Sequence, residues 1–463
     1  MRVLFVNLNN GLSRSEDFLI RLKEMQTVTN LACLAQVTLQ NRHSVKIVDC
    51  DVEDLNDSGL MNVITEYKPH ALVFHVEDAF IKEDLSRISF VKGNYEGAHI
   101  LISNNYLYHV NINNLANYDL TAVEAIIREE PNDLMPKILD ALFENYPATK
   151  ISNLRYKDSD KNWHKTDSVF FQHLDAISTP YRKGLKNELY MNVEKTEPMA
   201  VVKTTRGSTS MCIYESMQKI EGARMRRRSP ENVANEVVSC YKDYGITNFY
   251  LESEDFNHDD DWAYDVCYAI RNSDACGKVK LFAKIHLKAL SRSLVEEMSF
   301  AGFQFVIVNM CSGSDETLRR TKTGTNVKSF EESLTMLRHF GIRTYAIYRI
   351  GFPWEMKKHI DDTIKVISNN MHTYLDFQML RPCYLSEAEE MLVEEDLLGE
   401  TTDKITYAIK GTKYMKLSDI EKMYNGFWGK YKFLKMLKKE KVNEDRYRLT
   451  ESDKKIKGKK LAK

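Results

Sequence analysis

Segments that suit buried β-strands alternate with helical segments along most of this chain, and this alternation limits its possible folds more than any other feature. In the first third, apolar runs of strand length occur at Arg2–Asn7, Ser44–Asp49, Ala71–His75 and His99–Ile102. Segments with helical periodicity lie among them. This order predicts an α/β fold whose first domain, residues 1–150, is a parallel, doubly wound, Rossmann-like sheet.

The alternation resumes after a segment that reads as a linker. Residues 151–197 have weak periodicity and contain the break at Pro180. Residues 198–385 then hold six strand-like runs with helical stretches between them: Ala200–Lys203, Asn248–Leu251, Val279–Ala283, Phe305–Asn309, Thr344–Ile350 and Asp376–Leu380. Six strand–helix units are too few for a closed eight-stranded barrel, so we predict an open, partial (β/α)6 barrel. Its ligands are expected at the carboxyl ends of the strands.

The last part of the chain differs in composition from the two domains. Residues 386–463 are charged and helix-prone, and they end in the lysine-rich run Lys454–Lys463. We predict a helical C-terminal region with a basic tail. A chain of 463 residues is too long for one compact core, which agrees with two domains and an appendage.

The loop after the first strand of the second domain carries the strongest motif. It reads T-R-G-S-T-S-M-C-I-Y-E over residues 205–215, and R-S-P-E-N-V follows at 228–233. Farther on come A-G-F at 301–303 and G-F-P at 351–353. In this order the segments resemble the radical S-adenosylmethionine superfamily, whose cluster loop reads R-G-C-x-x-x-C-x-aromatic-C. The first domain is similar to the cobalamin-binding module that precedes many such barrels, through its strand order and its Val48–Asp49 strand end.

The cluster motif of this chain departs from the family at two positions. Ser208 stands where the first cysteine belongs and Glu215 where the third belongs, while Cys212 and Tyr214 are in register. In the family, three thiolates hold a four-iron cluster whose open iron chelates S-adenosylmethionine. Iron in such clusters prefers thiolate to hydroxyl or carboxylate, so we do not expect a four-iron cluster here.

Further departures affect both candidate cofactors, S-adenosylmethionine and cobalamin. Cys311 stands where the family commonly has a glutamate, and Ser312 follows it. Ser103 and Asn104 stand where the family places a glycine pair that lets bare backbone approach the cobalamin tail. The resemblance therefore keeps S-adenosylmethionine as a candidate ligand and weakens the case for cobalamin.

The resemblance implies a set of cofactor-binding positions, whereas no catalytic residue and no metal site can be assigned. The positions are Ser208, Cys212, Tyr214, Glu215, Glu252, Glu254, Cys311, Ser312 and Gly351 in the barrel, with Ser103 and Asn104 in the first domain. Two alternatives remain open. Cys212, Cys311 and Cys383 all follow strands and could form a remodelled metal site, and Glu215 could act as a general acid or base.

Composition excludes several classes of protein. With 65 Lys+Arg against 66 Asp+Glu, a net charge of -1 gives no global field that would attract nucleic acid. The apolar run Val3–Val6 is too short for a signal peptide or a membrane span. The 8 cysteines include no C-x-x-C pair, which argues against a disulfide framework. We expect a cytoplasmic protein that binds neither membrane nor nucleic acid.

Three functional hypotheses follow from the resemblance, and the third, an ordinary radical enzyme with an unusual set of cluster ligands, is the one that the missing cysteines favour least. The first is a pseudoenzyme: a non-catalytic or accessory subunit of a cobalamin or S-adenosylmethionine enzyme system, partnered by a radical S-adenosylmethionine paralogue with an intact motif. The second is an active enzyme that uses S-adenosylmethionine, cobalamin or both without a four-iron cluster, in methyl transfer or other sulfonium chemistry. Either of the first two hypotheses allows a small-molecule ligand at the barrel mouth.

Overall fold

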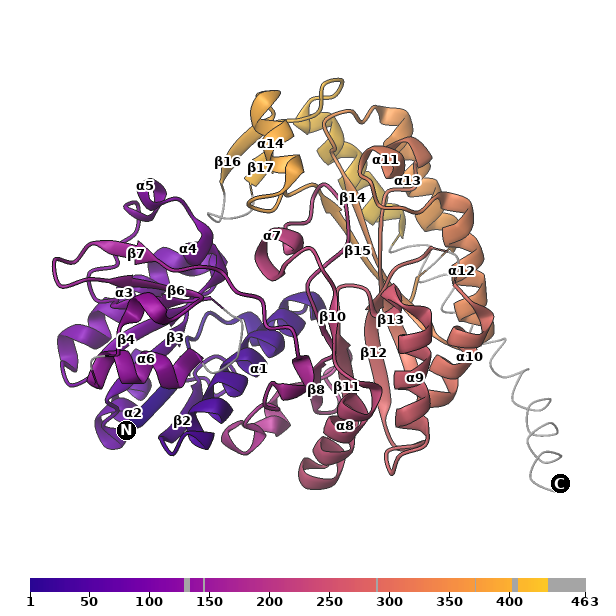
Figure 1. Ribbon diagram of the computed structural model, residues 1–463. Helices are drawn as coiled ribbons and strands as arrows, with labels where there is room; N and C mark the ends of the chain where they lie inside the picture. Colours follow the sequence, from indigo (N-terminus) through magenta and orange to yellow (C-terminus); the bar gives the residue numbers. More distant parts are fainter. Residues whose placement is uncertain (129–133, 145, 289, 371, 402–406, 432–463) are drawn as a thin grey trace.

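The computed structural model describes residues 1–128, 134–144, 146–288, 290–370, 372–401 and 407–431. Its first sheet has seven strands in the order β2-β1-β3-β4-β5-β6-β7 (Figure 1). The strands are β1 (Arg2–Asn7), β2 (Ser44–Asp49), β3 (Ala71–His75), β4 (His99–Ser103), β5 (Ala125–Ile127), β6 (Leu154–Lys157) and β7 (Trp163–Lys165). The helices are α1 (Phe18–Gln40), α2 (Asp57–Tyr67), α3 (Ile81–Asn94), α4 (Asn105–His109), α5 (Ile112–Leu115) and α6 (Leu134–Phe143). Strands β1 to β5 pair in parallel, as the doubly wound prediction requires.

The segment predicted as a linker is partly built into the first sheet. β6 pairs with β5 and β7 pairs with β6, both antiparallel. The prediction of a linker over 151–197 was therefore wrong for its first part. Short antiparallel edge strands, here with the exposed polar pair His164 and Lys165, lack the long buried apolar run that marks a central strand.

The second sheet has six strands in the order β15-β14-β13-β12-β11-β8. They are β8 (Met199–Lys203), β11 (Asn248–Glu252), β12 (Lys280–Ile285), β13 (Phe303–Cys311), β14 (Arg343–Ile350) and β15 (Tyr374–Met379), and all of their pairings are parallel. The predicted six-stranded partial barrel is thus confirmed. A small pair, β9 (Thr205–Arg206) and β10 (Arg226–Arg227), lies beside the loop that follows β8.

The outer layer of the barrel consists of helices with clear sequence signals at their ends. They are α8 (Pro230–Tyr244), α9 (Asp260–Arg271), α10 (Arg292–Ala301), α11 (Asp315–Arg320), α12 (Val327–His339) and α13 (Lys357–Asn370). The short helix α7 (Met217–Glu221) lies instead on the side of the barrel that faces the first domain (Figure 1). Ser229 caps α8 by accepting from the Asn232 backbone, and Pro230 occupies its first turn. Gly302 ends α10 in the left-handed conformation.

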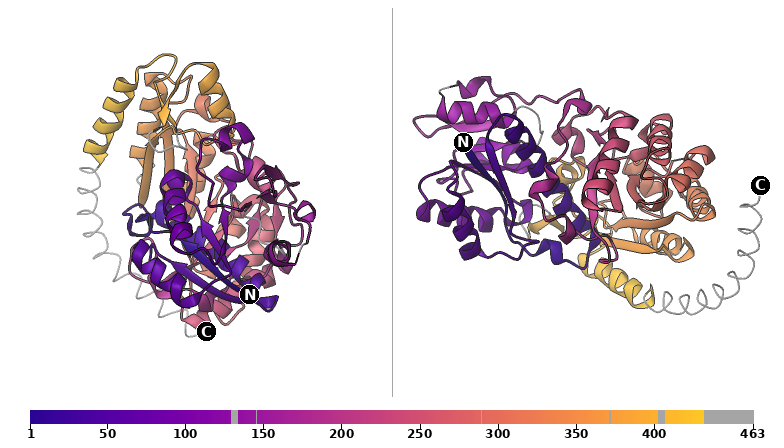
Figure 2. Two further views of the ribbon diagram at one scale, coloured as in Figure 1. Left: turned by 90° about the vertical axis from the view of Figure 1, so that its left-hand side faces the viewer. Right: turned by 90° about the horizontal axis from the view of Figure 1, so that it is seen from below.

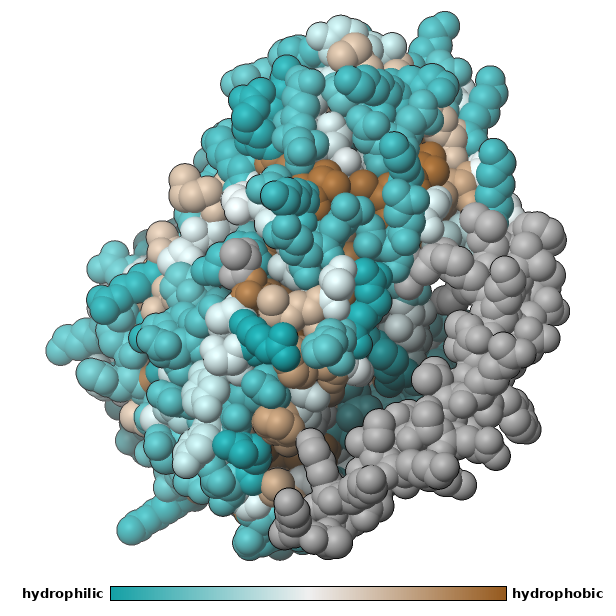
Figure 3. All heavy atoms as spheres, turned by 90° about the vertical axis from the view of Figure 1, so that its right-hand side faces the viewer, coloured by the Kyte–Doolittle hydropathy of each residue, from teal (hydrophilic) through white to brown (hydrophobic). Residues whose placement is uncertain are grey.

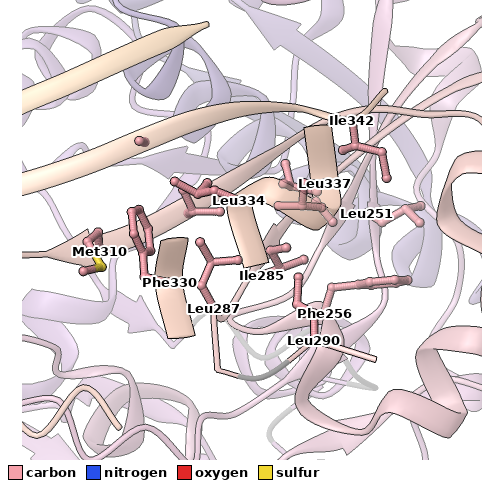
Figure 4. Close-up of a cluster of buried hydrophobic side chains, with 14 of the residues drawn as sticks. Leu251, Phe256, Ile285, Leu287, Leu290, Met310, Phe330, Leu334, Leu337 and Ile342 are labelled. Atoms are coloured by element: carbon pink, nitrogen blue, oxygen red, sulfur yellow. The ribbon is translucent and has the colours of Figure 1, made fainter. Parts of the chain in front are cut away.

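Apolar side chains fill the space between the barrel strands and these outer helices. Leu251 and Ile285 of the sheet face Phe330, Leu334 and Leu337 of α12 (Figure 4). All five are at most 1% exposed. The outer face of the helices, seen in Figure 3, is mainly hydrophilic with apolar side chains in small groups. This layer is the structural core of the barrel, and it leaves the inner face of the sheet available for a site.

Helix α1 joins the two domains (Figures 1 and 2). Its C-terminal half, including Leu31 and Leu34, packs on the first sheet. Its N-terminal half, including Phe18 and Leu22, packs on the inward side chains of the barrel strands. The Phe18 ring lies 5.9 Å from the ring of Phe305, edge-on. A single helix with two apolar contact surfaces therefore fixes one domain against the other.

The C-terminal region is not simply helical. Helix α14 (Glu387–Glu394) is followed by an antiparallel pair, β16 (Leu398–Thr401) and β17 (Tyr407–Ile409), and then by helical residues 417–431. The predicted basic tail lies outside the described residues. Within the part of the chain that the structure describes, no helix is long and apolar enough to cross a membrane.

Candidate functional site

The inward face of the barrel changes from apolar to polar along each strand. Toward the amino ends, inward side chains such as Phe282, Phe305 and Tyr345 pack under α1. At the carboxyl ends the corresponding side chains are polar: Lys203, Glu252, Lys284, Asn309, Arg349 and Gln378. Since side chains on one face of a strand recur at every second residue, each polar group lies above an apolar one. The carboxyl edge of the sheet thus carries a polar tier.

A cavity of about 310 Å³ lies on this tier, between the barrel and α1. Tyr250, Ile307 and Ile347 form its apolar floor, and Leu19 and Leu22 of α1 contribute to one wall. The polar lining comes from strand ends and from the loops after β8 and β11: Glu215, Glu221, Glu252, Glu254, Lys284, Asn309 and Arg349. A cavity of this size with converging charged groups is typical of a small-molecule site.

The loop that carries the cluster-like motif forms another wall. Gly207 opens it at φ +86°, where an added Cβ would lie 2.2 Å from the Arg224 carbonyl oxygen. Ser208 is buried, and its hydroxyl accepts a hydrogen bond from the Ser210 backbone at 3.1 Å. Burial raises the pKa of the Cys212 thiol to about 12. Neither Ser208 nor Cys212 lines the cavity, whereas Glu215 does.

Glu215, at the third cysteine position, is part of a charged network centred on Lys284. The Lys284 ammonium lies 2.6 Å from Glu254 and 3.6 Å from Glu215. Asn309 contacts Glu215 at 3.5 Å. Burial lowers the pKa of Lys284, but the carboxylates around it outweigh burial and raise this pKa well above its ordinary value. The network ties the motif loop to β12, β13 and the loop after β11.

Arg349 stands on the other side of Asn309. Its guanidinium donates to the Asn309 side-chain oxygen at 2.8 Å and lies 4.7 Å from the centre of the Tyr214 ring. It forms no ion pair with a carboxylate among the described residues. The cation–π contact explains the position of Tyr214 in the wall. Asn309 and the Tyr214 ring therefore hold the guanidinium in place, and its charge helps to lower the pKa of Glu215.

Glu252 ends β11 on the opposite side of the cavity. Its Oε1 pairs with Lys203 at 2.8 Å, and its Oε2 is buried without a hydrogen-bond partner in the described part of the chain. Glu221 pairs with Arg206 at 3.7 Å and accepts from the Gly207 backbone at 3.1 Å. Lys203 and Arg206 thus compensate two of the glutamates from outside the cavity lining.

The remaining predicted barrel positions do not line the cavity. Cys311 is buried and contacts Thr321 at 3.8 Å, and Ser312 shares a 3.0 Å hydrogen bond with Thr363. Gly351 has φ +100° and lies under Ile409 of β17, whose Cδ1 would be 2.4 Å from an added Cβ. These residues shape the loops behind the mouth instead of contacting a ligand there.

Gly351 is held by a buried carboxylate that the motif analysis missed. Glu355 Oε2 accepts from the backbone of Gly351 at 2.7 Å and of Phe352 at 3.2 Å, and Oε1 accepts from Thr317 at 3.2 Å. Glu355 is 0% exposed, and burial raises its pKa to about 7 despite these hydrogen bonds. Its role in this structure is to fix the turn after β14.

The three cysteines considered as a remodelled metal site do not form one. Cys212 and Cys311 are buried, and Cys383 is exposed toward the cavity. Within the described residues no group of three or more His, Cys, Asp or Glu side chains is arranged to hold a metal ion. The donors at the three cysteine positions of the motif are one thiol, one hydroxyl and one ion-paired carboxylate, which is not the donor set of a four-iron cluster.

Ser103 and Asn104 lie apart from this cavity, at the carboxyl edge of the first sheet. Both are 1% exposed. The Asn104 amide donates to the Val76 carbonyl at 2.7 Å and to Asp78 at 2.8 Å, and its oxygen accepts from the Leu107 backbone at 2.6 Å. Polar side chains therefore occupy the two positions where a glycine pair would let the backbone approach the cobalamin tail. This edge of the sheet does not offer the tail that backbone contact.

A second group of buried polar residues fills the same edge. Asn7 donates to Asp49 at 2.9 Å and to Glu24 of α1 at 3.2 Å. Tyr190, from the segment between the domains, donates to Asp49 at 2.9 Å. Burial raises the pKa of Asp49 to about 6 and that of Glu24 to about 8. This edge of the sheet is occupied by its own polar contacts and by α1.

The motif analysis missed Lys284, Asn309 and Arg349, although the sequence carries a signal for them. Each is a polar residue at the carboxyl end of an apolar strand, two positions after an inward apolar side chain. Reading alternate positions along each strand would have identified them. Their pairing with Tyr214, Glu215 and Glu254 could not be read in this way, because it depends on how the loops fold over the strand ends.

No known family profile matches the chain. An uncharacterised methyltransferase of Pyrococcus horikoshii is 22% identical over 368 residues, covering 80% of this chain and 79% of that protein. OxsB, a cobalamin-dependent S-adenosylmethionine radical enzyme, superposes with a TM-score of 0.72 at 12% identity, over 88% of this chain and 64% of OxsB. TsrM, a radical S-adenosylmethionine methyltransferase from Kitasatospora setae, superposes with a TM-score of 0.71 at 14% identity, over 86% of this chain and 77% of TsrM.

The chain has the fold of the cobalamin-dependent radical S-adenosylmethionine enzymes. Both domains take part in these superpositions, since they cover most of the chain. One OxsB structure holds aqua-cobalamin, and one TsrM structure holds cobalamin and a four-iron, four-sulfur cluster. The methyltransferase of Pyrococcus horikoshii is thus similar to this chain in sequence, and OxsB and TsrM are similar to it in fold.

Proposed function

We propose that this protein works without a four-iron cluster and serves as a non-catalytic, ligand-binding subunit of a cobalamin- or S-adenosylmethionine-dependent enzyme system. The observation that carries the proposal is the ion pair of Glu215 with Lys284 at the third cysteine position. At this position the ion pair between the Glu215 carboxylate and the Lys284 ammonium holds the motif loop, where a cysteine–iron bond would hold it in the family. The loop is thereby kept in a defined shape around an intact cavity.

The chemistry of the donors supports this proposal. A cluster held by one thiolate lacks two of its three protein ligands, and serine and glutamate oxygens are poor donors for iron of this kind. Recruiting Glu215 to iron would also separate it from Lys284 and Asn309. The partly buried Lys284 charge would then lose a carboxylate neighbour, which adds a cost to metal binding.

The first domain supports the same proposal with respect to cobalamin. Asn104 uses both its amide and its oxygen in internal hydrogen bonds at 2.6–2.8 Å. Opening the edge for a cofactor tail would break these bonds and leave buried polar groups without partners. We therefore propose that the domain is kept for its contact with the barrel through α1.

Iron and sulfide analysis after anaerobic expression tests the cluster part of the proposal. We expect the wild type to hold far less than the roughly four irons per chain of a full cluster. The double variant Ser208→Cys/Glu215→Cys restores the three-cysteine register and is expected to gain iron and sulfide. Thr209→Cys/Ser216→Cys, which adds two cysteines out of register, is the matched control. A stoichiometric cluster in the wild type would refute the proposal.

An active enzyme without a cluster is the second candidate, and one observation favours it. The cavity keeps a charged lining in which Arg349 has no carboxylate partner among the described residues. A protein kept only for its outer surface has no need of such a lining. Consumption of S-adenosylmethionine by the purified protein alone, abolished by Lys284→Met, would favour this candidate over the accessory subunit.

The partner in the proposal is a paralogue with an intact cysteine triad, since related folds readily form pseudo-symmetric pairs. Met211, in the middle of the motif loop, is 66% exposed, so an apolar side chain is available for contact at the barrel mouth. Co-expression followed by light scattering should give the mass of a complex, which Met211→Asp should weaken. Val393→Asp, at a residue 59% exposed on α14, is the control.

A further inference from the structure

We infer that α7 is a flap on the barrel-mouth cavity and that Arg128 of the first domain latches it. The inference rests on the proposed function in one respect. In a protein with a cluster, an iron bond would anchor the third cysteine position, which lies two residues before α7. Here the ion pair of Glu215 with Lys284, at 3.6 Å, anchors that position. A partly exposed ion pair separates and re-forms more readily than a metal–ligand bond, so the chain beyond it is free to move.

α7 forms one side of the cavity. Figure 1 shows the helix between the barrel and the first domain. Met217 and Glu221, at its two ends, line the cavity together with Ser216, which precedes it. A movement of α7 away from the barrel therefore removes part of the lining and widens the access to the charged groups behind it.

Polar contacts hold α7, whereas apolar burial contributes little. None of its five residues is buried. Lys219 forms an exposed ion pair with Glu390 at 3.3 Å. Residues 212–214, earlier in the same loop, are by contrast part of the hydrophobic core of the barrel. Segments with few buried apolar contacts open locally at a lower free-energy cost than the core. The chain thus changes from core to flap where α7 begins.

Gly222 ends α7 and provides the hinge. Its φ of +98° and ψ of 152° lie in a region that glycine adopts readily and other residues rarely. Its N–H donates to the Gln218 carbonyl inside the flap at 3.1 Å, and its carbonyl accepts from the Ser208 backbone at the base of the loop at 3.0 Å. Rotation about this one residue can therefore swing α7 while the base of the loop stays in place.

The latch consists of two arginines that contact one ring. Arg128, after β5, donates to the Ile220 carbonyl at 2.6 Å, and its guanidinium lies 4.3 Å from the centre of the Phe170 ring. Arg226 of β10 lies 5.3 Å from the same ring and donates to the Glu221 carbonyl at 2.7 Å. Carbonyls in the last turn of a helix lack partners within the helix, and cations there interact favourably with its dipole.

The latch makes the cavity depend on the first domain. Arg128 is 1% exposed, and it also donates to the Asn153 side chain at 2.9 Å and to the Val169 carbonyl at 3.3 Å. These contacts fix the guanidinium relative to β5 and β6. A rearrangement at the carboxyl end of β5 would move the donor away from Ile220 and release the flap. The flap thus transmits the state of the first domain to the cavity in the barrel.

Amide hydrogen exchange measured by mass spectrometry tests the flap. Lys219, Ile220 and Gly222 have N–H groups that bond to carbonyls of residues 216 and 218, so their exchange reports the opening of α7. In the iron-free wild type we expect them to exchange at least about 100-fold faster than the amides of β13, which exchange through larger openings. Arg128→Gln should raise the rate in α7 by about 10-fold and leave β13 unchanged, because a charge-assisted hydrogen bond is lost.

Two further variants complete the test. Phe170→Leu removes the ring between the arginines and should raise the rate in α7 by about 3-fold, which keeps the latch testable if Arg128→Gln does not fold. Arg338→Gln is the matched control, since it removes an arginine that donates to the Asn370 carbonyl at 3.0 Å in the outer layer. It should leave α7 within about 2-fold of the wild type. Circular dichroism confirms that each variant is folded.

Two results would overturn the inference. Exchange of α7 at the rate of β13 in the wild type would show that there is no flap, and an unchanged rate in a folded Arg128→Gln or Phe170→Leu protein would show that there is no latch. Iron content, measured on the same samples, is read separately. A protein with a cluster and a rapidly exchanging α7 would refute the proposed function alone, whereas an iron-free protein with a rigid α7 would refute the flap alone.

Discussion

Lys284 Nζ lies 2.6 Å from Oε2 of Glu254, in the wall of the barrel-mouth cavity. The same ammonium lies 3.6 Å from Glu215. One side chain at the end of β12 therefore holds two loops, one of which is the motif loop of the radical S-adenosylmethionine fold. The stability of the mouth should depend on this lysine more than on ion pairs elsewhere.

Replacing Lys284 tests this dependence. Lys284→Met keeps the length of the side chain but leaves Glu215 and Glu254 without their cation. Removing one member of a partly buried ion pair leaves a charge that solvent compensates only in part, so we expect the free energy of unfolding to fall by about 2 kcal/mol. Urea denaturation followed by circular dichroism measures the change. In Lys242→Met, which breaks an exposed pair with Asp274, the fall should be much smaller, because solvent screens an exposed pair.

Glu355 should make the stability of the barrel depend on pH. Burial raises the pKa of this carboxyl group to about 7 from an ordinary value of 4.5. The folded state thus binds a proton that the unfolded state has lost between these two values, so the contribution of Glu355 to stability falls as the pH rises from 4.5 to 7. The total loss from this group is on the order of 3 kcal/mol.

The variant Glu355→Gln isolates that contribution. Glutamine keeps an acceptor for the Gly351 backbone but cannot ionise, so the difference in the free energy of unfolding between variant and wild type should shift in favour of the variant as the pH rises from 4.5 to 7. Denaturation at several pH values in this range measures it. Glu395→Gln, on the surface beside Lys413, should show no such trend. A difference in the free energy of unfolding that stays constant from pH 4.5 to 7 would contradict the raised pKa of Glu355.

Phe18 should be critical for the contact between the domains. It is 3% exposed, and its ring lies 5.9 Å from Phe305 and 6.0 Å from Tyr345. Phe18→Ala opens a cavity between α1 and the barrel, and we expect a loss of about 3–5 kcal/mol in the free energy of unfolding. Phe90→Ala, at a residue 50% exposed on α3, should cost less than about 1 kcal/mol. Similar losses in both variants would show that α1 does not hold the domains together.

Gly207 should not tolerate a side chain. Its φ of +86° and the Arg224 carbonyl oxygen 2.2 Å from an added Cβ both oppose substitution. Gly207→Ala is therefore expected to lower the free energy of unfolding by at least about 2 kcal/mol. Gly426→Ala, at an exposed helical position with open space around it, should be neutral or stabilising by up to about 1 kcal/mol. Thermal denaturation of both variants distinguishes these outcomes.

The sequence by itself determined the order of elements and the second-domain fold. Apolar runs such as Phe305–Asn309 and the caps at Ser229 and Gly302 are local signals, because strand burial and helix ends depend on neighbouring residues in the chain. The short antiparallel strands β6 and β7 and the pair β16–β17 escaped prediction, since they lack such a run and exist through pairing with distant partners.

Only the tertiary structure decided which of the expected site residues face a ligand. It brings Tyr214, Glu215, Glu252 and Glu254 to the cavity and leaves Ser208, Cys212, Cys311, Ser312 and Gly351 behind its walls, with Ser103 and Asn104 on the other domain. The physical reason is that a loop's position over the strand ends is set by long-range charge pairs such as Glu215 with Lys284, whose members are far apart in sequence and have no local pattern in common.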